Sequence, residues 1–171
     1  MHFLIHLFSR FRLVPRTRYV FCLILLICLF LGAYCGAIAD PSLFPLMHRA
    51  VFSRVSIVCL AASQLLPFLF VAFAAVISNP VLLMAVCAYK FFAFSYVGVL
   101  VSIAFGSAGW LIRFLFLFCD ICLVPALCWF SLHILSEQRL ISKTFLVCFM
   151  LVIVTVLFDH FFISDFLMKL I

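Results

Sequence analysis

Residues 81–134 read VLLMAVCAYKFFAFSYVGVLVSIAFGSAGWLIRFLFLFCDICLVPALCWFSLHI. The stretch is apolar almost throughout, and a turn of small residues at 106–109 divides it into two segments, each long enough for a helix of ~20 residues to cross a bilayer. It nevertheless contains three charged residues, Lys90, Arg113 and Asp120. A charge at bilayer depth costs about 2.5–3.5 kcal/mol, so such residues are expected to face the interior of a helix bundle and to pair there.

The composition of the whole chain places it among integral membrane proteins. Of its 171 residues, 70% are hydrophobic and only 9% are charged, and the mean hydropathy is +1.47, far outside the range of soluble domains. This length leaves room for about five spans of ~20 residues and for no separate soluble domain. We therefore expect an all-α bundle of about five transmembrane helices that forms a single domain over residues 19–171. The expected spans are residues 19–39, 55–78, 81–105, 110–135 and 144–163.

The positive charges lie mostly at the ends of these spans. Residues 1–18 contain four arginines and apolar residues spaced for one face of a helix, which predicts an N-terminal amphipathic helix in the cytoplasmic interface. The net charge of +6 is therefore interpreted as membrane topology rather than nucleic-acid binding, and the lipid bilayer is the expected partner. Lys and Arg number six on the side of the N-terminus and three on the opposite side. The positive-inside rule then predicts a multi-pass protein of the cell membrane, with the N-terminus cytoplasmic and the C-terminus outside.

Two patterns within the spans predict contacts between helices. Gly32 and Gly36 are four residues apart in the first span, a spacing that lets another helix approach closely, in the same chain or in another one. Lys90 enters its span from the cytoplasmic end and Asp120 enters the next from the outer end, so the two reach similar depth and an interhelical ion pair is available. The pair is either a structural contact that sets helix register or a polar site for a proton or small solute. Trp110 and Arg113 are expected to anchor the fourth span at the outer interface.

No group of residues in the sequence has the pattern of a catalytic or metal site. Asp159 and His160 could form a hydrogen-bonded pair, but no serine or cysteine nucleophile, metal-ligand spacing or Gly-rich phosphate loop accompanies them, and we expect an exposed interfacial pair. The nine cysteines lie in apolar runs, where cysteine usually serves as a small buried hydrophobe. The C-x-x-C of residues 119–122 is mid-span, unlike a redox motif. The sequence therefore predicts no catalytic residue, no cofactor, no metal and no enzymatic activity.

Several short motifs occur in a definite order along the chain. They are Gly32-Ala33-Tyr34-Cys35-Gly36-Ala37, then Asn79-Pro80 before Tyr89-Lys90-Phe91, then Phe105-Gly106-Ser107-Ala108-Gly109, then Asp120 before Pro125-Ala126, and finally Leu157-Phe158-Asp159. In this order the chain resembles the stage II sporulation protein M family, from about Tyr19 to the C-terminus. By position, Lys90 matches that family's lysine after the third-span entry. Asp120 falls where the family's Leu-Pro-(His/Gln)-Asn motif has the asparagine, and Asp159 where it has a glutamate.

The resemblance implies a five-span, non-enzymatic membrane scaffold that localises peptidoglycan hydrolases and so takes part in cell wall remodelling during sporulation engulfment. An alternative function is the membrane subunit of a transporter, with Lys90, Asp120 and Gln64 lining a path and an external energy source. The two functions differ in the task of the intramembrane charges. In the scaffold they hold helices together, whereas in the transporter they contact the solute.

Overall fold

The structure is a computed structural model that describes residues 15–52, 56–77, 79–137 and 142–163. Every secondary-structure element in these ranges is helical, and five of the helices are long and apolar enough to cross a membrane. The five are Tyr19–Ala37, Ile57–Val76, Pro80–Ala104, Phe118–Leu135 and Lys143–Phe162. The predicted all-α transmembrane bundle is thus confirmed, and the chain is a multi-pass membrane protein.

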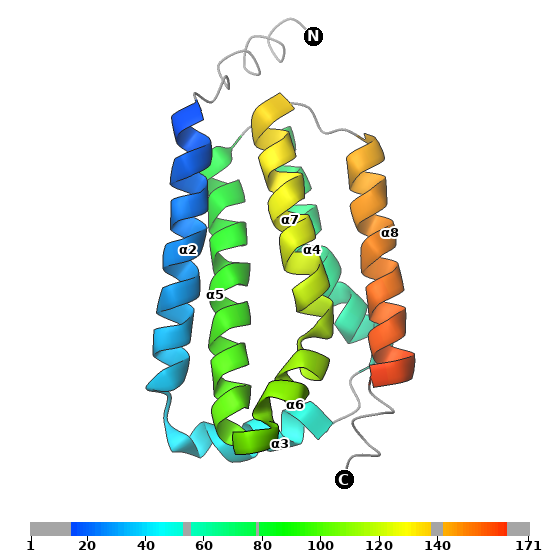
Figure 1. Ribbon diagram of the computed structural model, residues 1–171. Coiled ribbons are helices and arrows are strands. Elements are labelled where there is room, and N and C mark those ends of the chain that lie inside the picture. Colours follow the sequence, from blue (N-terminus) through cyan, green and yellow to red (C-terminus); the bar gives the residue numbers. More distant parts are fainter. Residues whose placement is uncertain (1–14, 53–55, 78, 138–141, 164–171) are drawn as a thin grey trace, which may run out of the picture.

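The long helices run alternately up and down the bundle, and short helices gather at one end (Figure 1). In chain order the elements are α2 (Pro15–Ala37), η1 (Pro41–Leu43), α3 (Phe44–Phe52), α4 (Ile57–Val76), α5 (Pro80–Ala104), η2 (Gly106–Ala108), α6 (Gly109–Phe116), α7 (Phe118–Glu137), α8 (Ser142–Phe158) and the π-helix η3 (Asp159–Ile163). The helix α2 begins at the upper end in Figure 1 and α8 finishes toward the lower end, the end at which α3 and α6 lie. Five crossings therefore separate the two ends of the described chain.

Capping residues explain where α5 begins and ends. Asn79 precedes the helix and its Oδ1 accepts a hydrogen bond from the Leu82 N–H at 3.1 Å, which satisfies one of the free donors at the helix start. Pro80 occupies the first turn, where its missing N–H costs nothing. After the helix, Gly106 has a φ of 54°, a left-handed conformation that glycine adopts without steric cost. The small-residue turn predicted here therefore forms.

Two parts of the chain differ from the sequence prediction. The stretch from Asp40 onward, which lies between the first two predicted spans, contains η1 and α3. The helix α3 is held in place because Met47 packs against Val101 of α5 and Ile112 of α6. The fourth span, predicted as residues 110–135, is interrupted at Leu117, so that α6 is a separate short helix. The span proper begins at Phe118, and α6, which precedes it, packs against α5 near the lower end of the bundle in Figure 1.

The predicted amphipathic helix of residues 1–18 falls largely outside the described residues. The part that is described, residues 15–18, belongs to α2 and continues directly into the first span. The candidate span itself begins at Tyr19, and the amphipathic character of residues 1–18 stays a prediction.

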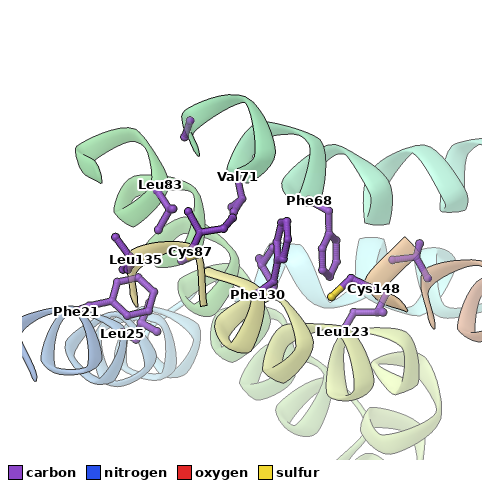
Figure 2. Close-up of a cluster of buried hydrophobic side chains, with 14 of the residues drawn as sticks. Phe21, Leu25, Phe68, Val71, Leu83, Cys87, Leu123, Phe130, Leu135 and Cys148 are labelled. Carbon is purple, nitrogen blue, oxygen red and sulfur yellow. The ribbon is translucent and has the colours of Figure 1, made fainter. Parts of the chain in front are cut away.

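The most buried span is α7, which packs against α4, α5 and α8. Figure 2 shows the apolar core around it, where Phe130 of α7 lies near Phe68 of α4. The core side chains of α2, Phe21 and Leu25, are almost fully buried, although the rest of α2 packs mainly along α5. Outward-facing side chains on every span are large and apolar, as expected for helices surrounded by lipid.

Candidate functional site

A polar cluster lies inside the bundle where α4, α5 and α7 meet. Lys90 of α5 donates hydrogen bonds from its Nζ to Asp120 Oδ1 of α7 at 3.0 Å and to Gln64 Oε1 of α4 at 3.0 Å. The first contact is also an ion pair. The structure therefore brings together the two charged residues that the sequence places at similar depth, and adds a glutamine from a third helix.

The cluster is largely sheltered from its surroundings. The side chains of Lys90 and Asp120 are 16% and 21% exposed, and Gln64 is buried. A void of about 10 Å³ adjoins all three, which is about the space that a single water molecule needs. A solute larger than water does not fit between these three groups.

The position of Asp120 on its helix adds to its stabilisation. Asp120 lies in the first turn of α7, where unpaired backbone N–H groups and the helix dipole favour a negative charge. This helix end exists because the fourth span is interrupted at Leu117. The carboxylate therefore has two sources of positive potential, the ammonium of Lys90 and the start of α7.

Gln64 could have been recognised as a partner of Lys90 from the sequence. The turn at Asn79 joins the two spans, and Gln64 lies fifteen residues before this turn, whereas Lys90 lies eleven residues after it. Two helices that meet at a short turn are antiparallel neighbours, so residues at comparable distances from the turn lie at comparable depth. The sequence prediction grouped Gln64 with Lys90 and Asp120 only as residues that would line a transport path, and it did not predict this hydrogen bond.

Gly32 and Gly36 lie at the contact between α2 and α5. A Cβ atom at Gly32 would overlap the backbone carbonyl oxygen of Phe92, and one at Gly36 would lie 2.7 Å from the carbonyl oxygen of Tyr96. Both glycines are buried. The small-residue motif therefore serves a contact within the chain, which answers the question that the sequence left open.

The side chain of Arg113 packs against α5. Its guanidinium would be 2.9 Å from a Cβ atom at Gly98, so the absence of a side chain at this glycine leaves room for it. On the same helix, Trp110 is 72% exposed and fits an interfacial position. The exposure of Trp110 agrees with the anchoring role predicted for these two residues, while for Arg113 that role stays a prediction.

Asp159 and His160 are half-buried, not exposed as predicted. They begin the π-helix that follows α8, and the carboxyl of Asp159 lies near the Cys119 thiol of α7. Cys119 in turn donates to the backbone oxygen of Thr155 at 3.3 Å. His160 Nδ1 is buried and has no hydrogen-bond partner among the described groups. The Cys119–Thr155 contact joins α7 to α8.

All nine cysteines are free thiols, with a range of exposure. Three are buried, Cys87, Cys119 and Cys148, whereas Cys22 and Cys59 lie on outward faces. In the part of the chain that the structure describes, no three His, Cys, Asp or Glu side chains gather as metal ligands. The buried thiols therefore act as small apolar groups, with Cys87 also hydrogen-bonded to Ser131 Oγ at 3.0 Å.

The fold and the site together define a multi-pass helical membrane protein with a charge-neutral polar cluster in its core. No family model, no curated protein and no solved structure matches the chain. Its function must therefore be argued from the geometry of the cluster and from the order of its sequence motifs.

Proposed function

We propose that the chain is a non-enzymatic membrane scaffold, whose polar cluster holds its own helices together and whose outer surface binds other membrane proteins. The observation that supports this function best is the closed cluster of Gln64, Lys90 and Asp120. The charges neutralise each other at 3.0 Å, and the adjoining void of about 10 Å³ has no room for a substrate. A buried pair of this kind sets helix register and orientation.

The outer surface offers what a scaffold needs. The outward faces of α2 and α8 expose large apolar side chains along their whole length, such as Phe30 and Tyr34 on α2 and Leu146 on α8. Helices in a membrane associate through close packing of such faces with those of partner spans. The described part of the chain presents this surface on a bundle whose Lys90 and Asp120 charges already neutralise each other.

The partners follow from the resemblance to the stage II sporulation protein M family. On that basis they are membrane-anchored peptidoglycan hydrolases, which the scaffold localises in the cell membrane during sporulation engulfment. The count of Lys and Arg by side supports an N-terminus in the cytoplasm and a C-terminus outside. This orientation places α3 and α6, at the lower end of Figure 1, on the outer side, where wall hydrolases act.

A second candidate function is the membrane subunit of a transporter. One observation favours it: Asp120 lines not only the small void but also a larger groove on the side of the bundle, with a volume of about 510 Å³. Intramembrane ionisable residues that line an open space mark solute pathways in many transporters. In this function Asp120 would contact the solute, and Lys90 would control the charge of Asp120.

A crosslinked pull-down of the tagged, full-length chain from sporulating cells tests the scaffold. We expect peptidoglycan hydrolases among the recovered proteins, both with the natural chain and with the double variant Lys90→Leu/Asp120→Leu, which removes the charges together. A substrate-uptake assay on the same double variant separates the alternative, because a transporter would lose activity. Recovery of no hydrolase from the natural chain would count against the scaffold.

A further inference from the structure

A groove on the side of the bundle begins at Asp120 and follows α7 upward. Its volume of about 510 Å³ lies within the ~300–1,000 Å³ of typical small-molecule sites. Apart from Asp120 its walls are apolar, with Leu29 from α2, Phe94 from α5, and Trp129 and Leu132 from α7. Twelve residues separate Asp120 from Leu132, a rise of about 18 Å along a helix. The groove is therefore an elongated apolar slot with one acidic end.

The groove opens toward the lipid rather than into the core. Pro125 and Trp129 line it and are both exposed, Trp129 by 52%. Both belong to a transmembrane span, and the space around such a span is hydrocarbon. A molecule that fills the groove would enter sideways from the bilayer.

The acidic end of the groove has hydrogen-bond acceptors to spare. Within the described ranges, the only side chain that donates to Asp120 is Lys90, and it does so to Oδ1. An ionised carboxylate accepts at about four positions. A carboxylate that borders an apolar space with few donors is costly, so a bound group with an O–H or N–H that reaches Asp120 would be stabilised here.

We propose that this groove binds a neutral membrane lipid that carries a hydroxyl group, which donates to Asp120 while the hydrocarbon chain lies along α7 between Phe94 and Trp129. Charge decides the headgroup. Lys90 already balances Asp120, so a cationic head would bring an uncompensated charge to bilayer depth, and an anionic head would meet the carboxylate. A lipid alcohol satisfies the acceptors and adds no charge. This binding site goes beyond the scaffold function and does not depend on it.

Photolabelling with a matched pair of probes tests the proposal. The full-length protein is placed in phosphatidylcholine nanodiscs with hexadecanol that carries a mid-chain diazirine, or with the methyl ether of the same molecule, which has no hydroxyl donor. Labelled residues are identified by mass spectrometry. We expect the alcohol to label groove residues such as Phe94 and Trp129 roughly three- to tenfold more than the ether does. This is roughly the difference in affinity that one hydrogen bond contributes within a membrane. Equal labelling by the two probes would overturn the proposal.

Three variants locate the effect. Cys128→Trp places a large side chain in the groove and leaves the ion pair intact, so labelling of the groove by the alcohol should fall to the level of the ether. Val154→Trp adds the same bulk on the lipid-facing side of α8, where Val154 is 60% exposed, and should change nothing. Lys90→Leu/Asp120→Leu removes the acceptor without leaving a lone charge, so the preference for the alcohol should disappear. A preference that survives in either the Cys128 or the double variant would contradict the proposed site, and the Cys128 variant decides the matter should the double variant fold poorly.

Discussion

Removing the charges of Lys90 and Asp120 one at a time and together is the most direct test of the polar cluster. Lys90 makes one bond to Asp120 and one to Gln64, each 3.0 Å long, and both charged side chains are about four-fifths buried. Breaking a buried pair by removing one partner costs about 3–5 kcal/mol, while the cost of one charge at bilayer depth is about 2.5–3.5 kcal/mol. Because neither side chain is fully buried, we expect about 2–3 kcal/mol for each single variant.

The order of the two single variants follows from the contacts that remain. In Asp120→Leu, the ammonium of Lys90 keeps the oxygen of Gln64 as a partner. In Lys90→Leu, the carboxylate of Asp120 loses the one side chain that donates to it among the described residues. We therefore expect Lys90→Leu to be the less stable of the two. The double variant leaves no lone charge and should lose only ~1 kcal/mol, which gives a coupling energy of roughly 3–5 kcal/mol.

The assay is reversible unfolding of the purified protein in phospholipid bicelles by increasing SDS, followed by tryptophan fluorescence. Gln64→Leu is the matched control, because it removes one hydrogen bond to Lys90 but no charge, and should cost about 1–2 kcal/mol. Additive effects of the two single variants, with the double variant the least stable of all, would refute the idea that the two charges stabilise the bundle as a pair.

Three further predictions concern other parts of the chain. Gly32→Ala should destabilise the protein by about 1–3 kcal/mol, because the new methyl group meets the backbone of Phe92. Gly98→Ala should cost less, because its methyl group meets only the movable guanidinium of Arg113. Thermal unfolding in detergent measures both variants, and equal losses of stability would contradict this account of the α2–α5 contact. A membrane-permeant thiol reagent should modify the outward-facing Cys22 and Cys59 in the folded protein, and the buried Cys87 and Cys148 only after unfolding. Peptide mass spectrometry identifies the modified residues, and modification of Cys87 in the folded protein would argue against its burial. At the start of η1, the N–H of Ser42 donates to Asp40 Oδ1 at 2.8 Å and holds the pKa of that carboxyl below its usual 3.8. Because the pKa is lower in the folded protein, this cap is intact at neutral pH and is lost only as the pH falls through the folded pKa. An NMR titration that finds the pKa of Asp40 at or above 3.8 would show that the bond does not form.

Much of the architecture follows from hydrophobic length alone. With no water in the bilayer core, each backbone polar group must be satisfied within its own segment, so apolar runs of about 20 residues become helices, and five such runs predict the five spans of the confirmed bundle. The ends of these helices follow from local chemistry in the same way, as Asn79 and Gly106 show at the two ends of α5. A charge at bilayer depth needs a partner wherever the other helices lie. The sequence alone therefore identifies Lys90 and Asp120 as residues that need one.

The lateral arrangement of the helices is a property of the tertiary structure alone. In a soluble protein the apolar face of a helix marks its buried side, but in a membrane the lipid is as apolar as the protein core, so the pattern along α2 or α7 does not tell which side faces a neighbour. For this reason the sequence left open which helix meets Gly32 and Gly36, and it missed both the pairing of Gln64 with Lys90 and the interruption at Leu117. The amino-acid sequence by itself determined the number, length and capping of the helices and the residues that need a partner, because these depend on contacts within one segment and its solvent. Only the packing of α2, α4, α5 and α7 around one another decided which groups meet, and it left Asp120 between a closed polar cluster and a groove open to lipid.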